Sequence, residues 1–217
     1  DRATPPARVL GDLRERDDGP LGCRVGGHRP ASGHAALAGH RPLAGVVRVE
    51  TVAQLFDVGS LLAHQPLPEG PRVAVVGNST AIGVLVAGAV LEEGLELAHE
   101  APVDIGVTGS PEEFRAALRA AVDDDRVDAV VAVFLPPLMS GSQEYGPALR
   151  EVARESTKPV VASFLSTEGV PDALAVLDED GMPARGSVPS YSTPERAVIA
   201  LAKVAEYARW RRRPVGQ

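Results

Sequence analysis

The chain has 217 residues, of which 44% are apolar and only 4% aromatic, and its formal net charge is −7. This length suits one large domain with a core of Ala, Val and Leu, with room for an appendage. The negative charge argues against nucleic-acid binding, and the single cysteine excludes an internal disulfide. No apolar run approaches the ~20 residues of a membrane span. We therefore expect a cytoplasmic protein with neither a nucleic-acid nor a membrane partner.

The first part of the chain, residues 1–45, is rich in Gly and Pro and contains three of the five histidines. It has little apolar periodicity, which predicts an irregular remnant of a preceding domain. Residues 46–71 follow as a strand, a helix and a linker. The strand is expected at residues 46–49, Thr51 is placed to cap the helix, and the linker is rich in proline.

Residues 72–94 predict a strand, a turn and a helix. The strand is continuously apolar, as in a parallel sheet that is buried on both faces. The turn is built of small polar residues, and the helix after it is expected near residues 81–93. Such a turn points backbone N–H groups and a helix dipole at one place, which favours a phosphate. The candidate phosphate-binding residues are Asn78, Ser79, Thr80 and Gly83. The alternative is a turn that binds nothing.

Strand and helix patterns then alternate to residue 213, which predicts a parallel sheet covered by helices. Expected helix starts include a capping box at Ser110 and Glu113, and a proline after Thr193. We predict a flavodoxin-like α/β three-layer sandwich over residues 72–213, with a five-stranded sheet in the order 2-1-3-4-5 and a tail at 214–217. The strands are expected at residues 72–76, 95–99, 129–134, 159–164 and 187–189.

The loops after the strands carry little reactive chemistry. Residues 136–140 follow the third strand, and Ser166, Thr167 and Glu168 follow the fourth. These loops lack the converging His, Cys or carboxylate ligands of a metal site, the aromatic rings of a flavin site and the acids of a phosphoacceptor domain. The GxxxxGK[ST] motif of a P-loop does not occur either. Anion capture by backbone and hydroxyl groups remains, or no ligand at all.

A second candidate is His34, which lies among small residues in the stretch SGHAA. A neutral imidazole nitrogen can act as a nucleophile in phosphoryl transfer, and small neighbours allow a phosphate to come close. The alternative is an exposed loop histidine.

The stretches RVAVVGNSTAIGVLVAGAVLEEGLEL, VDAVVAVFLPPL and KPVVASFLSTEGVPDAL resemble the C-terminal flavodoxin-like domain of the NDP-forming acyl-CoA synthetases, relatives of succinyl-CoA synthetase. The similarity is closest to the form fused to an acetyltransferase domain in bacterial protein lysine acetyltransferases. It covers residues 72–94 and 101–213. In this family the acid, CoA and a nucleoside triphosphate react through an acyl phosphate and a phosphohistidine. The resemblance implies that His34 matches that histidine and that the helix after Thr80 points at it.

The resemblance also implies what this chain lacks. The family's CoA-binding and ATP-grasp domains and any acetyltransferase domain are not found in the sequence, and the turn from Asn78 to Gly83 is poorer in glycine than the family's. We therefore expect a ligase module that is inactive alone and binds no cofactor by itself, with ATP or ADP, CoA and Mg²⁺ used by the full assembly. The alternatives are a non-catalytic scaffold or regulatory partner of a protein acetyltransferase, and an unrelated flavodoxin-type domain for a small ligand.

Overall fold

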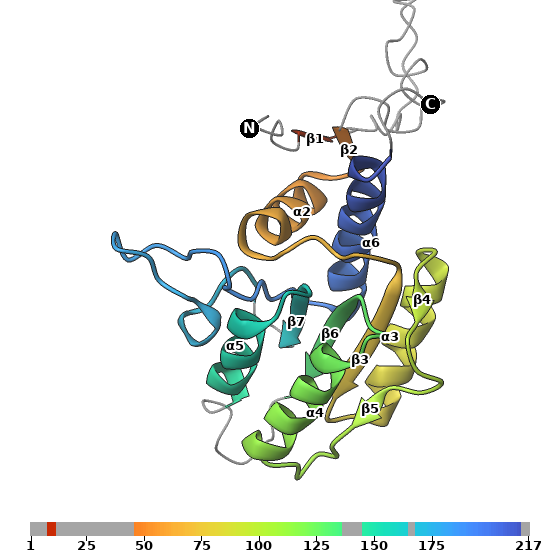
Figure 1. Cartoon of the computed structure of the whole chain (residues 1–217), viewed down its shortest axis with the longest axis vertical. Coiled ribbons are helices and arrows are strands. Elements are labelled where there is room, and N and C mark those ends of the chain that lie inside the picture. The colour runs from red at the N-terminus through yellow and green to blue at the C-terminus, as the bar shows by residue number, and fades with distance from the viewer. Residues whose placement is uncertain (1–7, 12–45, 136–144, 165–167, 214–217) are drawn as a thin grey trace, which may run out of the picture.

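The computed structural model describes residues 8–11, 46–135, 145–164 and 168–213 (Figure 1). Its centre is a parallel sheet whose strands are short and apolar. These strands are β3 (Arg72–Gly77), β4 (Glu96–Leu97), β5 (Val103–Asp104), β6 (Ala129–Phe134) and β7 (Val160–Phe164). All six residues of β6 are buried, as expected for a central strand of a sheet with helices on both faces.

The sheet order is β4-β3-β6-β7, and β5 also pairs with β3. Because β6 occupies one edge of β3 along residues 73–77, β4 and β5 share the other edge. Of the predicted second strand at residues 95–99, only Glu96–Leu97 is a strand, and β5 lies outside the predicted range. The predicted fifth strand at residues 187–189 is not formed. Among the described residues, its place beside β7 is taken by an isolated parallel bridge between Ala162 and Ser190. The parallel α/β fold is confirmed, and the five-strand order 2-1-3-4-5 is not.

Helices begin where the sequence supplies caps. The Ser110 side chain accepts the N–H of Glu113, whose carboxylate accepts the N–H of Ser110 in return, as the capping box predicts. Thr193 caps the last helix, and a proline follows it at the first helical position. The helices of this domain are α3 (Thr80–Glu92), α4 (Pro111–Asp123), α5 (Tyr145–Glu155), α6 (Pro194–Arg211) and the short 3-10 helix η1 (Asp172–Leu174).

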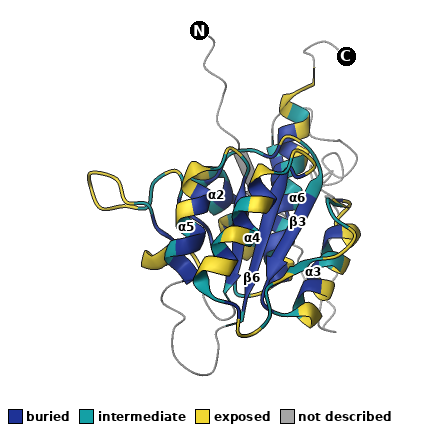
Figure 2. Ribbon diagram, turned by 60° about the horizontal axis from the view of Figure 1, so that its bottom comes forward, coloured by how far each residue is buried: buried dark blue, intermediate teal, exposed yellow. Residues whose placement is uncertain are grey.

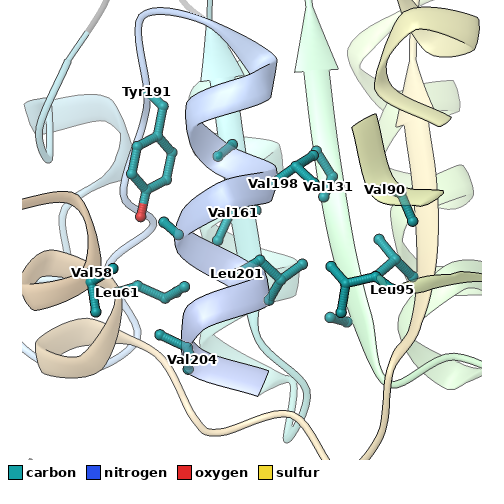
Figure 3. Packing of buried hydrophobic residues seen from close by; sticks show 14 of the residues in the cluster. Val58, Leu61, Val90, Leu95, Val131, Val161, Tyr191, Val198, Leu201 and Val204 are labelled. Carbon is teal, nitrogen blue, oxygen red and sulfur yellow. The ribbon is translucent and has the colours of Figure 1, made fainter. Parts of the chain in front are cut away.

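Alternate residues of the strands face two separate apolar clusters. Val73 and Val75 of β3 point to the side covered by α3 and α6, and Ala74 and Val76 point to the side covered by α4 and α5. Figure 3 shows part of the first cluster, where Val198, Leu201 and Val204 of α6 lie among residues of the sheet and of the helix before it. This arrangement gives the three layers of the predicted sandwich.

The residues before the sheet also form regular structure. Strand β1 (Arg8–Gly11) pairs in parallel with β2 (Val46–Val49), so four residues of the segment 1–45 are a strand rather than irregular chain. Helix α2 (Val52–His64), capped by Thr51 as predicted, packs on α6. The residue after α2, Gln65, is buried and fixes the end of the helix. Its side chain forms hydrogen bonds with the backbone of Val160 in β7 and of Ser187. Among the described residues, no helix combines the length and the apolar character needed to cross a bilayer.

An exposed excursion joins η1 to α6 and projects from the body of the molecule in Figure 1. Leu177 and Pro183 form an antiparallel bridge at its base. At its tip, Gly181 has a φ of 77° and its N–H donates to the carbonyl of Asp178. A glycine suits this left-handed position, which closes the turn over residues 178–181.

Candidate functional site

The candidate site is the first turn of α3, at the carboxyl end of β3. The strand ends at Gly77, where a Cβ atom would lie 2.6 Å from the carbonyl oxygen of Val133 in β6. Only glycine fits this close approach of two strands. Ser79 then adopts an extended backbone and its carbonyl accepts the N–H of Gly83 at 2.9 Å, which starts the helix. The amides of the first turn have no partner within the helix, which is the property that attracts anions.

Asn78 performs a structural task in this turn. Its side-chain amide donates to the carbonyl of Leu135 at 2.8 Å, and its side-chain oxygen accepts the N–H of Leu135 at 2.8 Å. The residue is only 3% exposed. Asn78 therefore ties the end of β3 to the residue after β6, and both ends of its side chain are already in use.

The first turn of α3 holds a carboxylate of the chain itself. The Thr80 hydroxyl donates to Asp104, the last residue of β5, and the N–H of Gly106 donates to the other oxygen of that carboxylate at 2.8 Å. The side chain of Ser79, at the N-cap position, makes no capping hydrogen bond. A carboxylate therefore lies beside the helix start, where the sequence predicts a phosphate.

These contacts stabilise the ionised form of Asp104. The hydrogen bond from Thr80, followed by the one from the Gly106 amide, holds the pKa of the Asp104 carboxyl below its usual value. A phosphate that approached the same turn would meet a negative charge, so the carboxylate would have to move or share the helix start. Sequence reasoning missed Asp104. The available signal was an Asp two residues before a glycine, a pattern typical of a turn closed by the Asp side chain.

Gly83 has a packing role. It is buried, and a Cβ atom there would lie 2.9 Å from the ring of Pro102. The glycine therefore allows α3 to pack closely against the segment between β4 and β5. The N–H of Gly83 donates to the carbonyl of Ser79, so it is not one of the first-turn amides that are left for a phosphate.

A second polar cluster lies after β7. The guanidinium of Arg196, in the first turn of α6, donates to both oxygens of Asp57 in α2 at 2.9 and 2.8 Å and to the hydroxyl of Ser192 at 2.8 Å. It also donates to Glu168, whose pKa is held below its usual value by Ser192 and then by Arg196. The sequence analysis identified Glu168 as a residue of the loop after the fourth strand, but it did not identify Arg196 as its partner. Since every charge here is paired, the cluster joins α2 to α6 and offers no free group for chemistry.

Several predicted residues fall outside the described part of the chain. His34, the loop at residues 136–140, Ser166 and Thr167 all lie there, so their expected roles stay predictions. Within the described ranges there is no group of three or more His, Cys, Asp or Glu residues that could hold a metal ion.

Comparison with known proteins relates the chain to acetate–CoA ligases. No family model matches it. Over 116 residues it is 25% identical to the alpha subunit of the ADP-forming acetate–CoA ligase I of Pyrococcus furiosus. That match covers 52% of this chain but only 24% of the ligase subunit. The chain is thus similar in sequence to a part of such a ligase.

Solved structures share the fold. The dinucleotide forming acetyl-coenzyme A synthetase 1 of Ca. Korarchaeum cryptofilum superposes with a TM-score of 0.64 at 22% identity, over 77% of this chain and 40% of that one. The same protein has been solved in complex with phosphate and ADP. PH0766 of Pyrococcus horikoshii gives a TM-score of 0.67 at 21% identity, over 83% of this chain and 45% of its own. The chain therefore spans less than half the length of these structures, and at this identity they show the fold alone.

Proposed function

We propose that this chain is a module of an NDP-forming acyl-CoA ligase that works beside nucleotide-binding and CoA-binding domains. The observation that carries the proposal is the similarity to the Pyrococcus furiosus ligase subunit in a chain with the synthetase fold. Because the chain spans 40% of that synthetase, we expect the ATP-grasp and CoA-binding parts to be supplied by partner domains or subunits. Acetate is the acid that the relative's name suggests.

The resemblance gives two parts of the chain a role in this reaction. A nucleoside triphosphate would phosphorylate His34, the phosphohistidine would pass its phosphoryl group to the carboxylate of the acid, and the thiol of CoA would displace phosphate from the acyl phosphate. Helix α3 would stabilise the phosphohistidine through its first-turn amides and the hydroxyl of Ser79, and the Thr80 hydroxyl would join them by turning from Asp104 to the phosphate. The placement of this helix start at the carboxyl edge of the sheet, where ligands of such folds bind, supports the role.

A second candidate function is a non-catalytic scaffold or regulatory domain, for example for a protein acetyltransferase. The observation that favours it is the carboxylate of Asp104 at the start of α3. A side chain that already satisfies this turn lowers its affinity for a second anion, because two negative charges at one helix start repel each other. In this case the synthetase fold would be kept for packing and partner binding.

Thioester synthesis distinguishes the two functions. The full chain is incubated with ATP, Mg²⁺, acetate and CoA, alone and with a candidate ATP-grasp and CoA-binding subunit, and acetyl-CoA is measured. We expect no product from the chain alone and product with the subunit, lost in His34→Ala. Product from the chain alone would overturn the inactive-module proposal. Equal product with and without the chain, or with His34→Ala, would favour the scaffold.

A further inference from the structure

The start of α5 holds a buried tyrosine hydroxyl beside the loop that follows β5. Helices α4 and α5 lie side by side on the same face of the sheet (Figure 2). Tyr145, the first residue of α5, is only 8% exposed. The centre of its ring lies 4.1 Å from that of Phe134 and 6.0 Å from that of Phe114. These contacts fix the ring and, with it, the position of the hydroxyl.

The hydroxyl of Tyr145 holds one end of a tight turn. It donates to the carbonyl of Gly109 at 2.6 Å. The N–H of Gly109 in turn donates to the carbonyl of Gly106 at 3.1 Å, and a Cβ atom on Gly109 would lie only 2.6 Å from the carbonyl oxygen of Ile105. A phenylalanine ring would fill the same apolar surroundings, so the specific contribution of the tyrosine is its bond to this turn.

The same turn holds the carboxylate that lies beside the start of α3. The N–H of Gly106 donates to one oxygen of Asp104 at 2.8 Å, and the hydroxyl of Thr80 donates to the other. A continuous line of hydrogen bonds therefore runs from Tyr145 in α5, through the turn, to Asp104 and the first turn of α3.

Strand pairing alone does not set the direction of this carboxylate. Asp104 pairs with Gly77, whose carbonyl accepts the N–H of Ile105 at 2.9 Å, and this fixes the backbone at the end of β5. The side chain of Asp104 is on an exposed residue and can still change rotamer. Its direction therefore depends on the groups that donate to it, and one of these is the N–H of Gly106.

We propose that Tyr145 is a positioning residue for the Asp104 carboxylate, and that it thereby controls how readily the start of α3 exchanges this carboxylate for a phosphate. The hydroxyl holds the turn, so it keeps the N–H of Gly106 where Asp104 accepts it. Without the hydroxyl the turn is looser, and Asp104 leaves Thr80 more readily. The effect on phosphate rests on the proposed function, whereas the effect on Asp104 does not.

The test compares Tyr145→Phe with the wild-type full chain by NMR. The variant keeps the ring and removes only the hydroxyl, so we expect an unchanged circular dichroism spectrum. Hydrogen exchange at the Gly106 amide should rise about fivefold, as expected when one ordinary hydrogen bond is lost. The pKa of the Asp104 carboxyl, followed through the signal of its carboxyl carbon, should rise towards its usual value, because the bonds from Thr80 and from the Gly106 amide favour the ionised form.

The matched control is Tyr191→Phe. It also removes a buried tyrosine hydroxyl that donates to a backbone carbonyl, that of Asp57 at 3.1 Å. We expect this variant to lower the overall stability but to leave the exchange at Gly106 and the titration of Asp104 as in the wild type. Two results would overturn the proposal: no change at Gly106 and Asp104 in Tyr145→Phe, or equal changes in Tyr191→Phe.

A titration with inorganic phosphate separates this inference from the proposed function. Tyr145→Phe should bind phosphate more tightly than the wild type, and it should add nothing to the gain in Asp104→Asn, since both changes act through one carboxylate. A gain that adds in full in the double variant would overturn the action through Asp104. If neither variant binds phosphate, the phosphate site of the proposed function is wrong, while the exchange at Gly106 still decides the role of Tyr145.

Discussion

Asn78 shows how a residue that looks suited to binding can be fully used in the fold. Both ends of its buried side chain bond to the backbone of Leu135 at 2.8 Å. Asn78→Ala leaves a donor and an acceptor of that backbone unpaired, and we expect it to lower the free energy of unfolding by about 2 to 4 kcal/mol. Urea denaturation measures this loss. A loss below about 0.5 kcal/mol would mean that water replaces the amide without cost.

Asp104 decides whether the start of α3 can accept a phosphate. Asp104→Asn removes one negative charge beside Thr80, and we expect it to raise the affinity for inorganic phosphate about fivefold to tenfold. The measurement is a phosphate titration at pH 7 that follows the amide signals of Ala81 and Ile82 by NMR.

The control for this titration is Asp125→Asn, which removes an exposed carboxylate that makes none of the described side-chain hydrogen bonds. It should leave the affinity unchanged, since net charge alone has little effect at this distance in salt. If Asp104→Asn and Asp125→Asn bind phosphate equally, the Asp104 carboxylate does not control the site.

The difference between Asn78 and Asp104 explains what the sequence could and could not predict about the site. Local spacing predicts a turn and a helix start after β3, and both are present. The partners of those residues come from far along the chain, Leu135 for Asn78 and Asp104 for Thr80. Because side-chain pairing depends on which strands become neighbours, it follows from the tertiary fold and not from the spacing of residues.

At the level of elements, a bidentate ion pair adds to the apolar packing of helix α2 on α6. Arg196 donates to both oxygens of Asp57, whose side chain is 10% exposed. Asp57→Asn replaces a charge-assisted pair by a weaker one, and we expect a loss of about 2 kcal/mol in stability. Hydrogen exchange should rise in α2 and stay unchanged in the amides of β6.

An exposed ion pair provides the contrast for this prediction. Arg119 and Glu155 bridge α4 and α5 with side chains that are 37% and 52% exposed. Glu155→Gln should therefore cost less than about 1 kcal/mol. Two results would contradict a specific role of the Arg196–Asp57 pair in attaching α2 to α6. One is a loss of stability in Asp57→Asn no larger than that in Glu155→Gln, and the other is an equal rise of hydrogen exchange in β6.

The elements also differ in how well local signals predict them. The capping box at Ser110 and the cap at Thr193 are short-range patterns, and both helices begin where they indicate. The edge of the sheet is less regular than its centre. The predicted second strand is reduced to the two residues of β4, and β5, which the sequence did not predict, pairs with the opposite end of β3. An edge strand has one neighbour only, so a loop can interrupt it at little cost.

For the whole molecule, the carboxyl groups predict a loss of stability in acid. In the part of the chain that the structure describes, four carboxyl groups have a pKa held below its usual value, chiefly by hydrogen bonds from arginine or from hydroxyl and amide groups. Each contributes stability that is present above its unfolded pKa of about 3.9 to 4.3 and is lost as the pH falls towards its lower folded value. These residues are Asp104, Asp124, Asp128 and Glu168.

We therefore expect the free energy of unfolding to fall steadily from about pH 5 to about pH 2. Urea denaturation at several pH values measures the slope. Asp128→Asn, which removes the partner of Arg72, should lower the stability at neutral pH and flatten the slope. A free energy that does not change over this range would show that these carboxyl groups have the same pKa in the folded and unfolded chain.

We propose that this fold takes part in phosphoryl transfer within a larger ligase. This proposal is tested by the transfer of labelled phosphate from γ-labelled ATP to the chain in the presence of Mg²⁺ and an ATP-grasp subunit, before acetate and CoA are added. We expect an acid-labile label on the wild-type chain that is absent in His34→Ala and is discharged when acetate and CoA are added. A chain that stays unlabelled beside an ATP-grasp subunit that is active with its own partner would contradict the claim.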